Sequence, residues 1–112
     1  MKNIENIKIF QTSTLNNALK KMADGGIKIV LVIDKEDKLL GTLSDGDIRR
    51  GLLNGMDLNS TIESIFFKKP TIAKISDPKE EILKLALSKQ IDQIPIIDEN
   101  GKIQSIYLLH EF

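Results

Sequence analysis

The sequence contains no cysteine and no tryptophan, and only 4% of its residues are aromatic. Without cysteine there is neither a disulfide framework nor thiolate chemistry, as is common in cytoplasmic proteins. No apolar run approaches the roughly 20 residues of a membrane-spanning helix, and Glu5 and Lys8 interrupt any signal-peptide core. The formal net charge is zero, so charge gives no signal for nucleic acid or an anionic membrane. We therefore expect a soluble, cytoplasmic protein with neither of those partners.

The remaining composition is that of a globular domain, with 112 residues, 41% of them hydrophobic and 29% charged. Apolar patterning and turn residues predict strands and helices that alternate along the chain. The expected strands cover residues 7–10, 27–33, 38–43, 71–75, 94–97 and 102–108. The expected helices cover residues 15–23 and 48–56, a short stretch around 62–66, and a segment that starts after Asp77-Pro78. Pro95 predicts a strand edge, a strand end or a bulge.

Each expected helix has a cap and an apolar stripe. Hydroxyl residues at 12–14 and the Asp77 carboxylate are the expected N-caps of the first and last helices, and Ser60 begins a capping-box pattern before residue 62. Gly25-Gly26 is the expected end of the first helix. The buried stripes are expected at Leu15, Ala18, Leu19 and Met22, at Ile48, Leu52, Leu53 and Met56, and at Ile82, Leu83, Ala86 and Leu87.

The stretch from residue 41 to residue 50, GTLSDGDIRR, is the strongest candidate for a binding site. An apolar strand stops at Ser44, and an amphipathic helix follows Asp47. Junctions of this kind gather free backbone N–H groups at the positive end of a helix dipole, where ligands commonly bind.

The chain repeats itself at an offset of 64 residues. Ile33-Asp34 aligns with Ile97-Asp98, and Lys38-Leu39 aligns with Lys102-Ile103. A duplicated unit of this kind is expected to pack as two copies around a pseudo-twofold axis. On this offset Ser44 corresponds to Leu108, so the first junction is polar and the second is mostly apolar, which predicts one binding site per chain.

The predicted divisions are a first repeat at residues 7–58, a linker with a short helix at 59–70, and a second repeat at 71–112. Phe112 corresponds to Ile48, so the second repeat lacks its last helix. We therefore expect this sequence to be a fragment of a longer chain.

The tandem strand-helix-strand-strand-helix units and the junction motif together resemble a pair of cystathionine-β-synthase (CBS) domains, also called a Bateman module. The ligand signature of that family is similar to Gly-x-hydrophobic-Ser/Thr-x-x-Asp, which is filled here by Gly41, Leu43, Ser44 and Asp47. The resemblance implies an α/β fold of tandem βαββα repeats. It also implies a homodimer, and AMP, ADP, ATP or S-adenosylmethionine as a regulatory ligand.

The string Ser-Asp-Gly-Asp-Ile-Arg-Arg resembles the pair attached to sugar-phosphate nucleotidyltransferases and is also similar to the pair in sugar-phosphate isomerases. An N-terminal Met1 and a chain that stops within a repeat favour the first arrangement, with a catalytic domain downstream. The resemblance thus implies a non-catalytic, regulatory module of a cytoplasmic transferase. Two alternatives stay open: the module of an isomerase, and a structural dimerisation module without a ligand.

The junction residues match the parts of an adenine nucleotide. The Asp47 carboxylate accepts hydrogen bonds from a ribose diol, and Ser44 bonds a hydroxyl or a phosphate. Arg49 and Arg50 point about 100° apart on a helix, so one of the two is expected to reach the phosphate, and Arg50 is counted among the site residues. Lys28, Ile29 and Val30 are expected to supply backbone groups and an apolar wall for the base, and Thr42 completes the candidate site. The same Ser44-x-x-Asp47 spacing is also that of a capping box, and the two roles are compatible.

Other residues give weaker signals. Asp45 and Asp47 lack the regular spacing of a calcium loop, so no metal site is expected. His110, the only histidine, is expected at the surface. Of Phe66 and Phe67, one is expected in the core and the other in a dimer contact. No catalytic constellation is visible.

Overall fold

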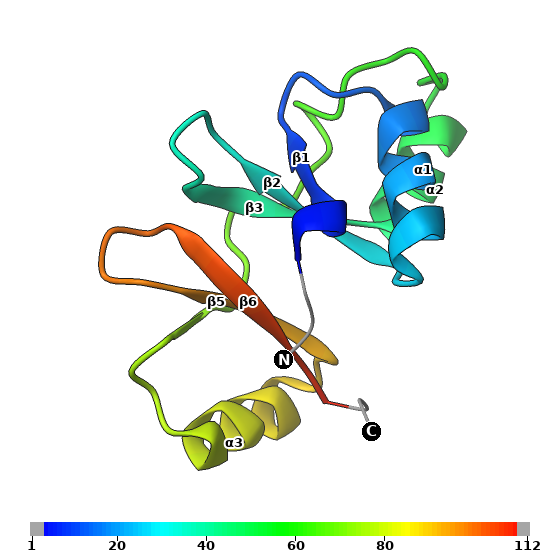
Figure 1. Cartoon of the computed structure of the whole chain (residues 1–112). Coiled ribbons are helices and arrows are strands. Elements are labelled where there is room, and N and C mark those ends of the chain that lie inside the picture. Colours follow the sequence, from blue (N-terminus) through cyan, green and yellow to red (C-terminus); the bar gives the residue numbers. More distant parts are fainter. Residues whose placement is uncertain (1–3, 110–112) are drawn as a thin grey trace.

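Two three-stranded sheets, one from each half of the chain, form the centre of the computed structural model, which describes residues 4–109 (Figure 1). The first half contains a 3₁₀ helix η1 (Glu5–Ile7), β1 (Lys8–Phe10), α1 (Leu15–Gly25), β2 (Ile29–Ile33), β3 (Leu39–Ser44) and α2 (Asp45–Leu53). The second half contains β4 (Ala73–Lys74), α3 (Lys79–Lys89), β5 (Gln93–Ile97) and β6 (Ile103–Leu108). This is the expected α/β fold of tandem repeats, and in the described part no counterpart of α2 follows β6.

The two sheets have the same topology. In each, the first strand runs parallel to the central strand, and the third runs antiparallel to it. Ile29 pairs with Ser44 in the first sheet, and Gln93 pairs with Leu108 in the second, so the registers coincide at the 64-residue offset. Both central strands also carry an irregularity at the same place, before Ile33 and before Ile97. The duplication seen in the sequence is therefore a duplication of structure.

Identical turns close the two antiparallel hairpins. In each, Oδ1 of the leading aspartate, Asp34 or Asp98, accepts hydrogen bonds from the amides two and four residues later, at 2.8 and 3.0 Å. The fourth residue of each turn has positive φ: 67° at Asp37 and 84° at Gly101. An aspartate tolerates this left-handed conformation better than most residues with a side chain, which explains why the first copy manages without glycine.

The two turns also bond to each other. The Leu39 amide donates to the Gly101 carbonyl at 3.0 Å, and the Ile103 amide donates to the Asp37 carbonyl at 3.1 Å. Exchanging the two repeats converts one of these hydrogen bonds into the other. The predicted pseudo-twofold relation is thus visible in individual contacts.

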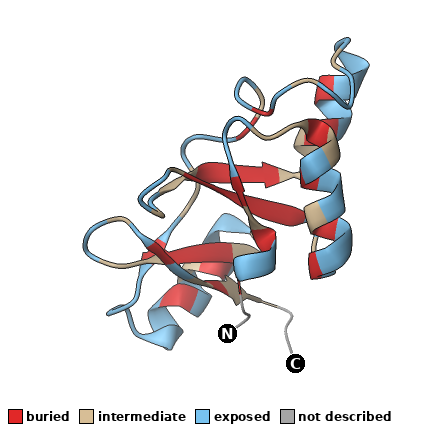
Figure 2. Cartoon of the chain, turned by 45° about the horizontal axis from the view of Figure 1, so that its top comes forward, coloured by how far each residue is buried: buried red, intermediate tan, exposed pale blue. Residues whose placement is uncertain are grey.

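The larger core cluster spans both repeats. It contains Val30, Leu31 and Leu43 from the first sheet together with Ile103 and Ile106 from β6. A smaller cluster lies under α3 and includes Ile82, Ala86, Ile94 and Ile96. Buried positions follow the strands in Figure 2, and β2 is buried along its whole length, as a central strand should be.

The buried stripe of α2 differs from the prediction. Ile48 is buried, but Leu52 and Leu53 are 41% and 80% exposed, and Met56 is half-buried beyond the helix end. Gly51 takes the inward position one turn after Ile48, where a Cβ atom would lie 3.1 Å from Met56 Sδ. The contact face is therefore narrower than the apolar periodicity indicates.

The same correction applies to α3. Ile82 and Ala86 are buried, whereas Leu83 and Leu87 are 39% and 58% exposed. The helix thus contacts its sheet through a stripe of i and i+4 positions. Leu19, which corresponds to Leu83, is likewise exposed in α1, so both repeats orient this helix in the same way.

The predicted short helix at residues 62–66 is absent. The Ile62 carbonyl accepts the amides of residues 65 and 66, which makes a single turn. The next residue, Phe67, forms a two-bond antiparallel bridge with Thr42, and this extended backbone cannot continue a helix.

Two expectations about the ends of elements are also wrong. Asp77 does not cap α3: its carboxylate accepts the Lys74 amide at 2.9 Å, and Pro78 precedes the helix without any side-chain cap. Pro95 lies within the central strand β5, opposite Ile106. It is tolerated there because β4 is only two residues long and pairs with the two residues after Pro95.

Candidate functional site

The strand β3 runs directly into α2, and Ser44 is both the last strand residue and the N-cap of the helix. Ser44 Oγ accepts the Asp47 amide at 3.2 Å, while Asp47 Oδ2 accepts the Ser44 amide at 2.9 Å. This reciprocal capping box fixes the Asp47 carboxylate relative to the backbone. The capping interpretation is therefore confirmed.

The second oxygen of Asp47 also has a partner. Arg50 Nη2 donates to Asp47 Oδ1 at 2.6 Å, and one turn earlier Arg49 Nη2 donates to Asp45 Oδ2 at 3.1 Å. The Asp47 side chain is 19% exposed, whereas that of Arg50 is 69% exposed. The junction thus presents a half-buried carboxylate next to an exposed guanidinium on a long side chain.

A depression of about 240 Å³ opens beside this ion pair. Its lining comes from α2 and the linker: Asp47, Arg50, Gly51, Asn54, Met56 and Ile65. An anionic acceptor, a cation and apolar side chains therefore share one concave surface.

The remaining predicted site residues lie on the adjoining strands. Ile29 is the cross-strand partner of Ser44, and the carbonyl of Lys28 accepts the Asp45 amide at 3.1 Å. Val30 is fully buried and Thr42 is 8% exposed, so their side chains belong to the core behind the junction. The structure brings all the predicted residues to one region, but of Lys28, Ile29, Val30 and Thr42 only Lys28, which directly precedes β2, is exposed.

A buried lysine that the sequence analysis did not single out lies at the other end of the first sheet. Lys8 Nζ contacts Asp37 Oδ1 at 2.9 Å and Glu5 Oε1 at 3.0 Å, and its side chain is only 10% exposed. Burial alone would lower the pKa of Lys8, but the hydrogen bonds that its ammonium donates to Asp37 and Glu5 and the attraction of their charges outweigh burial and raise the pKa above its ordinary value. Lys8 thereby ties β1 to the turn at the pseudo-twofold axis.

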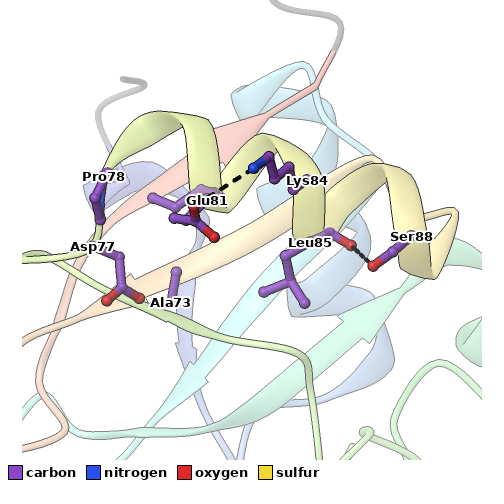
Figure 3. A pocket seen from close by; sticks show the side chains of 8 residues that line it. Ala73, Asp77, Pro78, Glu81, Lys84, Leu85 and Ser88 are labelled. Atoms are coloured by element: carbon purple, nitrogen blue, oxygen red, sulfur yellow. Dashed lines mark hydrogen bonds and ion pairs between the residues drawn. The ribbon is translucent and has the colours of Figure 1, made fainter.

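A groove between the first strand and the first helix occurs once in each repeat. The one along β4 and α3 measures about 510 Å³, and in Figure 3 Asp77, Glu81 and Lys84 surround it. The one along β1 and α1 measures about 330 Å³. The lining positions coincide at the 64-residue offset: Ile9 with Ala73, Ser13 with Asp77, Asn17 with Glu81, Lys20 with Lys84, Lys21 with Leu85, and Asp24 with Ser88.

Within residues 4–109, no three histidine, aspartate or glutamate side chains gather closely enough to hold a metal ion. Within the same range, no helix is sufficiently long and apolar to cross a membrane. His110 lies outside the described residues.

The CBS domain family model matches residues 2–54 and 62–110. The chain belongs to the CBS domain family. The two matched segments correspond to the two structural repeats, so the chain is a CBS pair. The predicted repeat bounds, 7–58 and 71–112, stay a prediction.

Solved structures share this fold at low sequence identity. A CBS domain protein of Pyrobaculum aerophilum complexed with AMP has a TM-score of 0.84 and 15% identity, over 97% of this chain and 83% of that one. The cytosolic domain of the Mg²⁺ channel MgtE in complex with ATP has a TM-score of 0.81 and 20% identity, over 96% of this chain and 43% of that one.

Similar sequences occur in longer bacterial proteins. The CBS pair is 25% identical over 101 residues to arabinose 5-phosphate isomerase GutQ of Escherichia coli, which covers 90% of this chain and 32% of the isomerase. It is 31% identical over 100 residues to an uncharacterized protein of Rickettsia prowazekii, over 89% of this chain and 31% of that protein. The chain thus spans about a third of these relatives. The likeness to GutQ fits the isomerase alternative and gives no support to the predicted nucleotidyltransferase.

Proposed function

We propose that this CBS pair is a regulatory, non-catalytic module that binds an adenine nucleotide at the junction of β3 and α2. The observation that carries the proposal is the Asp47 carboxylate, held at the rim of a depression by the Ser44 amide, with Arg50 beside it. A fixed carboxylate is a strong acceptor for the two hydroxyls of a ribose, and the adjacent guanidinium suits a phosphate.

The other site residues complete the proposed contacts. Ser44 Oγ offers a hydrogen bond to a sugar hydroxyl or a phosphate, and Lys28 and Ile29 border the base. Thr42 and Val30 support this surface from the core. Two structural neighbours complexed with AMP and ATP favour these nucleotides, and S-adenosylmethionine shares the same ribose and base.

The proposed regulation is a population shift. A ligand that contacts both α2 and the linker residue Ile65 favours one arrangement of the two repeats over another, and so biases an attached catalytic domain. The proposed parent is a cytoplasmic sugar-phosphate isomerase, because the CBS pair is similar to a segment that makes up about a third of the isomerase GutQ. A nucleotidyltransferase parent is the second candidate. Assaying the full-length protein for arabinose 5-phosphate isomerisation, with and without AMP, separates the two.

Titration calorimetry with AMP, ATP and S-adenosylmethionine tests the binding proposal. The native chain should bind at least one nucleotide, and Asp47→Ala should abolish that binding. Asp45→Ala is the matched control, because Asp45 lies in the same helical turn and pairs with Arg49 but does not line the depression. Circular dichroism checks that both variants retain their helices.

The absence of binding heat with all three ligands would overturn the proposal. The structural alternative, a dimerisation module whose junction only caps a helix, would then be favoured.

A further inference from the structure

In the structure, both oxygens of the carboxylate that would receive a ribose already accept a hydrogen bond. Asp47 Oδ2 holds the Ser44 amide and Asp47 Oδ1 holds the Arg50 guanidinium, at 2.9 and 2.6 Å. Each carboxylate oxygen has two lone-pair positions, but the Asp47 side chain is only 19% exposed, so a ribose diol competes with the donors already present for the accessible side of the carboxylate.

The two donors differ in how easily they leave. The Ser44 amide belongs to the capping box, and releasing it would leave a helix end unsatisfied. The Arg50 side chain is 69% exposed, and its guanidinium is held by this ion pair at the protein surface. Exposed ion pairs contribute roughly 0–1 kcal/mol, so Arg50 is the donor that exchanges.

The structure leaves space for this exchange. The Arg50 guanidinium folds back over the start of α2, where its Nη1 lies 3.5 Å from the position that a Cβ atom of Gly46 would occupy. Arg50 also lines the depression next to Asp47, so a released guanidinium stays beside a ligand held there. Arg49 pairs with Asp45 and does not line the depression.

We propose that Arg50 occupies the ribose-binding oxygen of Asp47 in the free protein and transfers to the phosphate of an incoming nucleotide. This inference rests on the proposed function. A nucleoside must displace Arg50 without offering it a new partner, whereas a nucleotide replaces the lost carboxylate with a phosphate. Arg50 is thus the residue that makes the site prefer nucleotides to nucleosides.

The test compares adenosine with AMP, by calorimetry, on the native chain, Arg50→Gln and Arg49→Gln. In Arg50→Gln, adenosine should bind about two- to five-fold more tightly, because the competing ion pair is gone. AMP should bind about ten-fold more weakly, because a charge-assisted contact is lost. The preference for AMP should therefore fall toward unity. Arg49→Gln carries the same charge change at the same 69% exposure and should leave both affinities within about two-fold.

Two outcomes would overturn the exchange while leaving the proposed site intact. Parallel weakening of adenosine and AMP in Arg50→Gln would show that Arg50 only orients Asp47. If Arg50→Gln bound AMP more weakly and adenosine with unchanged affinity, Arg50 would contact the phosphate without competing with the ribose for Asp47. Failure of the native chain to bind either ligand would instead overturn the proposed function, and the exchange with it. A thermal unfolding midpoint for Arg50→Gln close to the native value confirms that the capping box is retained.

Discussion

Lys38 and Lys102 pair with each other as an antiparallel bridge between the two sheets, although they are 64 residues apart in the chain. Each lies in the same position of its own repeat, so the pseudo-twofold axis passes through this bridge. The hydrogen bonds on either side of it, from Leu39 and Ile103, are equivalent. The interface between the repeats is therefore isologous, as in a symmetric dimer, within a single chain.

Replacing Gly41 should be strongly destabilising. A Cβ atom at this position would collide with the Phe67 carbonyl and lie 2.8 Å from Cδ2 of the buried Phe66 ring. Gly41→Ala should therefore lower the free energy of unfolding by about 2–3 kcal/mol in a urea titration. Gly46→Ala is the matched control, because its Cβ meets nothing closer than 3.5 Å and alanine favours a helix; its stability should be unchanged or slightly higher. Equal effects of the two substitutions would contradict the close crossing of the linker over β3.

Removing the N-cap of α2 should cost about 1 kcal/mol. Ser44→Ala loses the hydroxyl that accepts the Asp47 amide, one of the amides at the helix end that have no partner within the helix. Urea unfolding measures the loss, and faster hydrogen exchange at the Asp47 amide would locate it. Ser88→Ala is a suitable comparison, because Ser88 Oγ bonds only the Leu85 carbonyl of its own helix and should be nearly neutral. A neutral Ser44→Ala would mean that the capping box adds nothing to stability.

The Lys8 cluster predicts a dependence of stability on alkaline pH. Because the folded-state pKa of Lys8 lies above its ordinary value of 10.5, its contribution is present below that pH and is lost as the pH rises through the raised pKa. Lys8→Met should cost roughly 0.5–1 kcal/mol near neutral pH, and the difference from the native protein should shrink above about pH 10.5. Lys38→Met is the control, because Lys38 is 46% exposed and lies 3.6 Å from Glu36. If the difference in unfolding free energy between the native protein and Lys8→Met stayed constant with pH, the raised pKa of Lys8 would be refuted.

The exposed leucines of α3 predict self-association. Leu83 and Leu87 are 39% and 58% exposed on a helix whose buried residues are Ile82 and Ala86, and Phe67, at 55%, is the exposed member of the phenylalanine pair. If the expected homodimer forms through α3, Leu87→Glu should shift sedimentation velocity profiles toward the monomer. Phe67→Ser should do so only if the linker contributes to the contact. Ile75→Glu, at a position 63% exposed outside the helices, is the control. A native chain that sediments as a monomer at all concentrations would exclude the dimer.

The sequence predicts the repeat, the strands and the capped junction because these depend on local patterns and a fixed offset. Ser44 and Asp47 are three residues apart, so their contact follows from helix geometry. The bridge between Phe67 and Thr42 spans 25 residues, and that between Lys8 and Asp37 spans 29, and no local pattern encodes either. Apolar periodicity also predicts which face of a helix is apolar. It does not predict how much of that face the neighbouring elements bury. Leu53 and Leu87 are exposed for that reason.

The shared core has a consequence for the order in which the chain can fold during synthesis. Ile4 and Ile7 of the first repeat belong to the same cluster as Ile103 and Ile106 of the second. The first repeat therefore cannot complete its packing until β6 has left the ribosome, and part of its apolar surface stays exposed until then. The two repeats are separate in sequence but should fold in one cooperative step.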